Sequence, residues 1–203
     1  MNKIILGGLF FLASISLLHG QIVRGFGVKA GACTATQVWN DHSYGYRWGI
    51  DLGGYVEWLD MPVVTILSEV HYIQKGLRYR FYRTPGPLPD ETWNYDESTP
   101  RIDYLSFPIL GKVRYGFGEA EAYFVAGPRI DLLLGQDGDG WPLFAQNGTT
   151  SIGATLGFGI QTRVASFLTW GLELRYSPSF THDEIENFSV KNKSFEMLLS
   201  LAK

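Results

Sequence analysis

The chain has 203 residues, with 17 basic and 20 acidic side chains and a formal net charge of −3. This balance lacks the basic excess that binding to nucleic acid calls for, and we expect no nucleic-acid partner. The single Cys33 excludes an internal disulfide bond. Aromatic residues make up 15 % of the chain, charged residues only 18 %, and glycine is abundant at 24 residues. Such a mixture favours an all-β protein with apolar or crowded surfaces.

Residues 1–20 have the features of a secretory signal peptide. A basic start at Lys3 precedes an apolar run over residues 4–18, and Gly20 is the small residue before the expected cut. At about fifteen residues, the run is shorter than the roughly twenty that a transmembrane helix needs. We therefore expect residues 1–20 to be removed and residues 21–203 to form a single domain.

The segment from Ser151 to Thr181 has the clearest alternation in the chain. Over residues 151–164 one face is apolar and the other carries Gly, Thr, Gln and Arg, and the pattern repeats over residues 168–177. Successive side chains of a strand point to opposite faces, so the two runs predict a hairpin. Their length matches the roughly nine to eleven residues of a membrane-spanning strand, not the roughly five or six of an average soluble one. In a membrane barrel the apolar face meets lipid and the polar face lines the lumen.

The same alternation predicts six further strands. The eight expected strands are, in chain order, Ile22–Thr36, Tyr44–Leu59, Val63–Tyr82, Ile102–Phe117, Glu121–Leu134, Ser151–Val164, Leu168–Ser177 and Ser194–Leu201. In the third strand the apolar parity shifts, and a bulge near Gly76 would turn Leu77 and Tyr79 outward with the other apolar side chains. The polar segment from His182 to Lys191 is predicted as a connection.

The expected connections alternate in length. Those after the odd-numbered strands are long and polar, among them Thr84–Pro100 and Gly135–Thr150, whereas those after the second, fourth and sixth strands are tight. Transmembrane barrels have this asymmetry, with long loops outside the cell and short turns in the periplasm. The predicted fold is therefore all-β, an eight-stranded antiparallel up-and-down transmembrane β-barrel in the bacterial outer membrane. Outward aromatic residues are expected to form its interfacial girdles: Trp48, Trp58, Tyr115, Trp170 and Tyr176.

Four segments resemble the PorT-like outer-membrane β-barrel proteins of Gram-negative bacteria. They are Gly25–Gly31 (GFGVKAG), Tyr104–Tyr115 (YLSFPILGKVRY), Tyr123–Gly135 (YFVAGPRIDLLLG) and Leu172–Tyr176 (LELRY). The resemblance covers the chain from about Ile22 onward. It implies an eight-stranded outer-membrane barrel, and some members of that family are linked to protein secretion or gliding. The chain departs from the usual barrel pattern by ending in Lys203 instead of an aromatic residue that aids assembly.

Charged residues occupy the inward positions of the predicted barrel. An eight-stranded barrel is only just wide enough for its own side chains, so inward charges have to pair. We therefore expect a plugged lumen held by structural ion pairs, with a charged ligand site or ion path as the alternative. The expected network consists of Lys29, Arg47, Asp51, Glu57, Glu69, Lys112, Arg114, Glu121, Arg129, Asp131, Arg163, Glu173, Arg175 and Glu196.

The functional prediction rests on residues in the long loops. Aromatic side chains stand among prolines and acids there, and such residues favour protein contact. The candidate contact residues are Trp93, Tyr95, Trp141 and Phe144. The sequence thus predicts a non-enzymatic structural, adhesive or secretion-associated protein. We expect a monomer surrounded by outer-membrane lipid, with secretion-machinery or cell-surface proteins as partners.

Two alternatives belong to other classes. One is an outer-membrane lipid hydrolase that uses His182, with Asp183 and either Ser177 or Ser179 nearby. The other is a secreted lipocalin-like barrel whose apolar faces turn inward around a ligand. Neither serine lies in a nucleophile motif, and His71 is expected to be a hydrogen-bonded interior residue. We assign no catalytic residue, no cofactor and no metal ligand.

Overall fold

The computed structural model describes residues 23–39, 42–59, 61, 63–82, 95–137, 149–165, 167–181, 183–185 and 188–203. The predicted signal peptide, residues 1–20, lies outside them. The same is true of Trp93, Trp141, Phe144 and His182. For Tyr95 the structure describes the backbone only.

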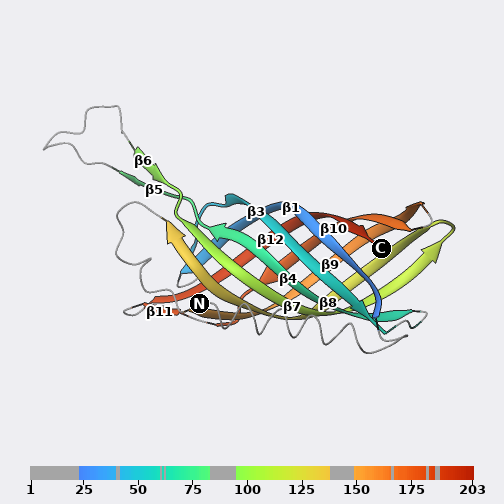
Figure 1. Cartoon of the computed structure of the whole chain (residues 1–203). Coiled ribbons are helices and arrows are strands. Elements are labelled where there is room, and N and C mark those ends of the chain that lie inside the picture. Colours follow the sequence, from blue (N-terminus) through green and yellow to red (C-terminus); the bar gives the residue numbers. More distant parts are fainter. Residues whose placement is uncertain are drawn as a thin grey trace, which may run out of the picture.

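Eight long strands form one closed antiparallel barrel (Figure 1). They are β1 (Val23–Trp39), β3 (Arg47–Trp58), β4 (Val64–Gly76), β7 (Arg101–Phe117), β8 (Ala120–Asp137), β9 (Thr150–Ala165), β10 (Leu168–Pro178) and β12 (Phe188–Ala202). Each pairs with its neighbour in the sequence, and β12 returns to pair with β1 from Gly27↔Ala202 to Trp39↔Val190. Closure leaves these long strands without a free edge. The prediction of an eight-stranded up-and-down barrel is confirmed.

The two ends of the barrel differ in their connections. Tight turns join β3 to β4, β7 to β8 and β9 to β10 at one end, which we call the short-turn end. The beginning of β1 meets the C-terminal residue there, because the amides of Phe26 and Lys203 donate to each other's carbonyls at 3.3 and 3.0 Å. The other four connections lie at the opposite, long-loop end. In outer-membrane barrels the long loops face outside the cell and the short turns face the periplasm.

Four short strands lie at the long-loop end. β2 (His42–Ser43) pairs with β1, and β11 (Asp183–Ile185) pairs with β12. β5 (Tyr79–Tyr82) and β6 (Tyr95–Ser98) form a separate two-stranded sheet that projects beyond the barrel rim (Figure 1). A bridge between Gly45 and Arg78 ties the root of this sheet to the rim.

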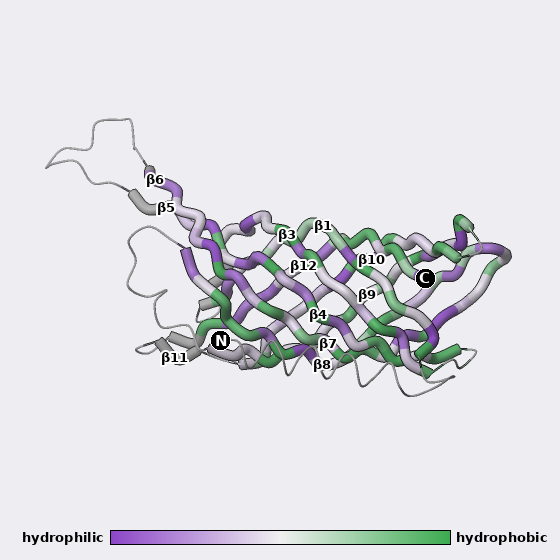
Figure 2. The backbone as a smooth tube through the Cα atoms, viewed as in Figure 1, coloured by the Kyte–Doolittle hydropathy of each residue, from purple (hydrophilic) through white to green (hydrophobic). Residues whose placement is uncertain are grey.

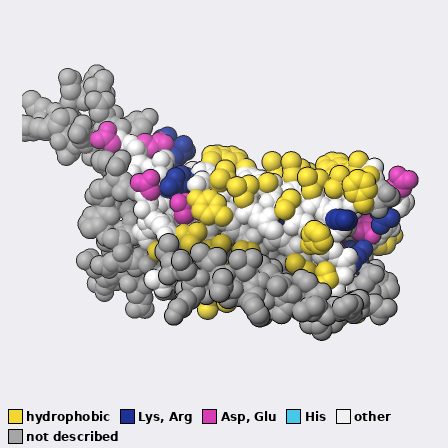
Figure 3. Space-filling view, viewed as in Figure 1, with side chains coloured by type: hydrophobic (Ala, Val, Ile, Leu, Met, Phe, Trp, Pro, Cys, Tyr) yellow, Lys and Arg dark blue, Asp and Glu magenta, His cyan; other side chains and the backbone are white. Residues whose placement is uncertain are grey.

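The membrane-facing surface of the barrel is apolar. Trp48 is 73 % exposed, Tyr115 is 75 % exposed and Phe26 is 60 % exposed. Apolar and polar residues alternate along the strands (Figure 2), and apolar side chains cover the middle of the face in Figure 3. The lipocalin-like alternative required the apolar faces to turn inward, and it is therefore wrong. Of the other expected girdle residues, Trp170 is exposed, whereas Trp58 and Tyr176 are half-buried.

Two local predictions need correction at the long-loop end. Gly76 has a φ of 145°, a conformation that favours glycine, but the inward parity does not change there. Leu77 and Tyr79 remain buried, so the expected outward turn is wrong. β12 begins at Phe188, inside the segment predicted as a connection. The sequence is polar there because this part of the strand lies beyond the apolar belt, where neither face needs to be apolar.

Candidate functional site

An ion network crosses the middle of the lumen. Lys29 on β1 donates from Nζ to Glu69 Oε1 on β4 at 2.7 Å and to Glu173 Oε2 on β10 at 3.0 Å. Arg175 donates both terminal nitrogens to Glu69, at 2.7 and 2.9 Å, and its Nε to Glu173. The hydroxyl of Tyr123 on β8 also donates to Glu173 at 2.9 Å. Four strands around the barrel thus converge on one hydrogen-bonded cluster.

His71 extends this network toward β3. Its Nδ1 lies 2.5 Å from Asp51 Oδ1, and its Nε2 lies 3.2 Å from Glu69 Oε2. Both ring nitrogens thus face carboxylates, that of Asp51 on β3 and that of Glu69 on β4. His71 therefore lies between two acids of neighbouring strands.

A second ion cluster lies nearer the long-loop end. Asp131 accepts from Lys75 Nζ at 2.7 Å and lies 3.1 Å from Arg129 Nε. Arg129 also donates to Glu196 at 3.2 Å, and the hydroxyl of Ser194 donates to Glu196 at 2.8 Å. An apolar cluster of Cys33, Ala35, Ile73, Ile102 and Tyr104 packs inside the same end of the barrel. Charged and apolar layers therefore both contribute to filling the lumen.

A third cluster lies toward the short-turn end. Lys112 Nζ donates to Glu57 at 2.9 Å and to Gln161 Oε1 at 2.8 Å. The amide of Gln161 in turn donates to Glu121 at 2.7 Å. Arg114 donates to the carbonyl of Met61 at 2.7 Å. These contacts link β3, β7, β8 and β9 across the lumen.

Rings fill the space that inward glycines leave. A Cβ atom added to Gly159 would lie 2.5 Å from Tyr123 Cζ, and one on Gly53 would lie 2.5 Å from His71 Cγ. The internal cavity beside His71 and Glu196 has a volume of about 10 Å³, no more than one water molecule needs. The described interior is therefore packed, and the inward glycines make that packing possible.

The fourteen predicted lumen residues do not all share one environment. Most are buried inside the barrel: Lys29, Asp51, Glu69, Lys112, Arg114, Arg129, Asp131, Glu173, Arg175 and Glu196. Glu57 and Glu121 are half-buried toward the short-turn end. Arg47 is half-buried at the opposite rim, where its Nε donates to the carbonyl of Thr99 at 3.3 Å. Arg163 is exposed at the short-turn mouth.

Sequence reasoning left Lys75 out of the network. It lies just before Gly76, where the sequence predicts a change of inward parity that the structure does not have. Continuing the inward parity of Glu69, His71 and Ile73 would have found it. The neutral partners Tyr123 and Gln161 also occupy inward positions, but only the contacts show that they complete the network.

The described residues give little support to hydrolase chemistry. The two candidate nucleophiles, Ser177 and Ser179, are 0 % and 5 % exposed and face the lumen. The hydroxyl of Ser177 lies 3.2 Å from Thr155 Oγ1, and that of Ser179 lies 2.6 Å from Ser151 Oγ. No group of three or more His, Cys, Asp or Glu residues in the described part of the chain could hold a metal ion.

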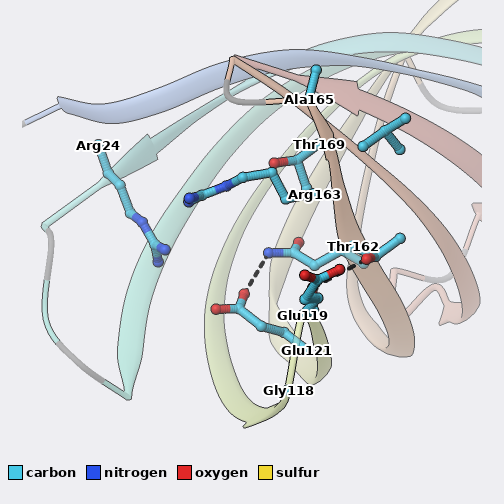
Figure 4. A pocket seen from close by; sticks show the side chains of 10 residues that line it. Arg24, Gly118, Glu119, Glu121, Thr162, Arg163, Ala165 and Thr169 are labelled. Carbon is cyan, nitrogen blue, oxygen red and sulfur yellow. Dashed lines mark hydrogen bonds between the residues drawn. The ribbon is translucent and has the colours of Figure 1, made fainter.

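Each mouth of the barrel carries a hollow. At the short-turn end a cavity of about 620 Å³, here named the short-turn cup, is lined mainly by polar side chains (Figure 4). These are Arg24, Glu119, Glu121, Gln161, Thr162, Arg163 and Thr169. At the long-loop end a hollow of about 360 Å³ lies at the root of the β5–β6 sheet, between Tyr44 and Arg78.

Ion pairs at the long-loop rim are exposed. Arg80 Nε donates to Glu97 at 3.0 Å, and Arg78 lies 3.5 Å from the same carboxylate. Arg101 lies 3.3 Å from Asp103. Charged side chains gather at this end in Figure 3, beside the sheet that leaves the barrel. The rim therefore presents mixed charge to solvent.

Comparison with known proteins supports the architecture. Residues 22–183 match the outer membrane protein beta-barrel domain family. Neisserial surface protein A has a TM-score of 0.53 at 14 % identity, over 91 % of this chain and 98 % of that one. OprG of Pseudomonas aeruginosa scores 0.48 at 9 % identity, over 91 % and 98 %. Ail of Yersinia pestis, solved with the heparin analogue sucrose octasulfate, scores 0.45 at 11 %, over 88 % and 98 %.

No curated protein sequence matches the chain. The likeness to Neisserial surface protein A agrees with the closed eight-stranded fold. The family match extends over most of the chain. The chain belongs to the outer membrane protein beta-barrel domain family, and it is a bacterial outer-membrane β-barrel.

Proposed function

We propose that this barrel does not conduct solutes and acts as a non-enzymatic structural and surface-interaction protein through its long-loop end. The filled lumen carries this proposal. Lys29, Glu69, Glu173 and Arg175 form ion pairs across the barrel interior, and each of these side chains is almost fully buried. With the lumen occupied by its own side chains, partners meet the protein at its ends.

The β5–β6 sheet makes the long-loop end the favoured contact surface. It stands beyond the rim, and its root is anchored by the buried Tyr79 (Figure 1). Its described side chains Arg80, Asp96 and Glu97 are exposed. The connections after β5 and β8 carry Trp93 and Trp141 in the sequence, and aromatic residues among polar ones are common anchors of protein interfaces.

The resemblance to PorT-like proteins suggests which class of partner the barrel contacts. The segments that carry the resemblance fall on β1, β7, β8 and β10. Because some members of that family are linked to secretion or gliding, a protein of the secretion machinery is the partner class we favour over other cell-surface proteins. We further propose that residues 1–20 are removed on export and that residues 21–203 act as a monomer in lipid.

Planar-bilayer recording tests the closed lumen. We expect the purified protein to give no current steps under conditions in which a porin of the same membrane does. Steady conductance from the folded barrel, verified by its altered gel mobility before boiling, would contradict the proposal.

Site-specific photo-cross-linking in cells tests the contact surface. A photoreactive residue in place of Arg80 or Glu97 should give a discrete protein adduct, which mass spectrometry then identifies. The same residue in place of the lipid-facing Trp48 is the matched control and should give none. Trp93→Ala combined with Trp141→Ala should remove the adduct, and an adduct of unchanged yield would argue against these aromatic anchors. The absence of any adduct from the rim would reject a surface-interaction role.

A further inference from the structure

We propose that Lys191 and Lys193, on the outer surface of β12, bind the phosphate group of lipid A, the phosphorylated glycolipid of the outer leaflet. The inference goes beyond the proposed function, which concerns protein contacts of the loops and of the β5–β6 sheet. It rests on three observations: the lysines lie at the edge of the apolar belt, they have no acidic partner in the described part of the chain, and aromatic side chains lie beside them.

The two lysines end a column of apolar side chains on β12. Continuing along the outward positions of this strand towards the long-loop end, the next residues are Lys193 and then Lys191. Basic side chains at such a boundary keep their methylene stems along the apolar surface and place the ammonium group among lipid headgroups. The apolar members of the column are between 45 % and 57 % exposed: Phe195, Met197, Leu199 and Leu201.

The ammonium groups of the two lysines have no partner in the described part of the chain. Neither lysine makes a hydrogen bond or an ion pair with any residue that the structure describes. By contrast, Arg78 and Arg80 at the same end of the barrel share the carboxylate of Glu97. The lysines are two residues apart on one face of a strand, so their Cα atoms are separated by roughly 7 Å. Two like charges at this spacing attract an anion that carries more than one negative charge, and lysine binds phosphate as a point charge.

The neighbouring strands place uncharged residues beside the lysines. Lys193 pairs with Thr36 of β1 on one side and with Pro178 of β10 on the other. Thr36 is only 2 % exposed, and its hydroxyl already donates to a backbone carbonyl at 2.8 Å. Lys191 pairs with Val38 of β1. These paired residues offer no carboxylate that would compete with a phosphate group for the ammonium groups.

Aromatic rings lie directly below the lysines. The ring of Phe195 packs against that of Tyr176 on β10, with their centroids 4.9 Å apart, and its centroid lies 6.3 Å from that of Tyr46. Tyrosine side chains are enriched where a barrel crosses the membrane interface, so the lysines stand at the level of the lipid headgroups. The apolar column below accommodates acyl chains. A lipid with a phosphate above its acyl chains fits both parts of this surface, whereas free phosphate fits only one.

The end of the barrel on which the lysines lie selects the class of lipid. They are on the long-loop side of the apolar belt, and the long loops of outer-membrane barrels face outside the cell. The outer leaflet of a Gram-negative outer membrane is built mainly from lipid A, whereas phospholipids form the inner leaflet. Lipid A is therefore the phosphorylated lipid that meets Lys191 and Lys193.

Native mass spectrometry of the purified barrel in detergent tests the site. The probe is lipid A, compared with dephosphorylated lipid A and with phosphatidylglycerol, and the measured quantity is the fraction of barrel that retains each lipid. We expect lipid A to bind most tightly. Lys191→Gln combined with Lys193→Gln should weaken its binding at least about tenfold, because each lysine near the membrane surface contributes to holding an anionic lipid. Inorganic phosphate in excess should not displace the lipid.

Two control variants separate the lysine site from general charge. Lys191→Arg combined with Lys193→Arg keeps both charges and should bind lipid A as the parent does. Arg163→Gln combined with Lys203→Gln removes the same charge from exposed positions at the short-turn end and should change nothing. The altered gel mobility before boiling verifies that each variant is folded.

Four outcomes would overturn the proposal. They are unchanged binding of lipid A by the variant with two glutamines, equal binding of dephosphorylated lipid A or of phosphatidylglycerol, displacement of the lipid by inorganic phosphate, and no binding of lipid A by the parent.

Discussion

The middle of the barrel and its long-loop end are built from the same strands with opposite chemistry. In the middle, charged side chains such as Glu69 face inward and apolar ones such as Val70 face lipid. At the long-loop end Leu77 and Tyr79 face inward, while the neighbouring Arg78 and Arg80 face solvent. Strand parity is continuous from one region to the other. The outer surroundings change from lipid to water. The apolar residues therefore move from the outward to the inward positions, while the same positions of the strand continue to face inward.

The largest expected effect comes from breaking the central network. Arg175→Met would leave Glu69 and Glu173 buried, with Lys29 as the one base described that contacts both of them, so we expect a loss of about 3–5 kcal/mol in the free energy of unfolding. Urea unfolding in lipid vesicles, followed by gel mobility, measures this loss. Arg175→Met combined with Glu69→Gln should recover part of it. A change under about 1 kcal/mol would mean that the network is dispensable.

Placing a charge on the lipid-facing side of the middle should cost slightly less. Met197 and Lys193 share the outward parity of β12, but Met197 lies in the apolar belt and Lys193 lies nearer the long-loop end. We expect Met197→Arg to lower stability by about 2–4 kcal/mol in vesicles. Lys193→Arg is the matched control and should be neutral. Equal effects at the two positions would place the membrane boundary elsewhere.

Filling an inward glycine of the middle should have an intermediate effect. A Cβ on Gly159 would overlap the ring of Tyr123, so Gly159→Ala should cost about 1–3 kcal/mol in the same unfolding assay. Gly111 is the control, because a Cβ there would have its nearest neighbour at 3.7 Å. Gly111→Ala should leave stability within about 0.5 kcal/mol of the parent. Similar losses at both glycines would exclude ring packing as the cause.

The smallest effect is expected at the long-loop rim. Glu97 pairs with Arg78 and Arg80, whose side chains are 46 % and 57 % exposed. Glu97→Gln should therefore change the free energy of unfolding by no more than about 1 kcal/mol, and the change should shrink as salt is added. A loss as large as that of Arg175→Met would erase the distinction between the two regions.

Sequence patterns were sufficient for the strands and their faces in the middle of the barrel. Lipid on one side and a narrow lumen on the other impose a strict period of two, which is visible in β9 and β10 without any structure. The same rule failed beyond Gly76, since water replaces lipid there and an apolar residue no longer marks the outward face.

By itself, the sequence determined an all-β chain of eight long strands with apolar outward faces and a charged interior. Only the tertiary structure decided which charges meet. Lys29 and Glu173 are 144 residues apart, and Glu69 and Arg175 are 106 apart. Their contact depends on the tilt and register of the closed barrel, which bring side chains from distant strands to the same level. The short-turn cup is likewise a product of closure, because Arg24 and Arg163 come from strands that do not pair.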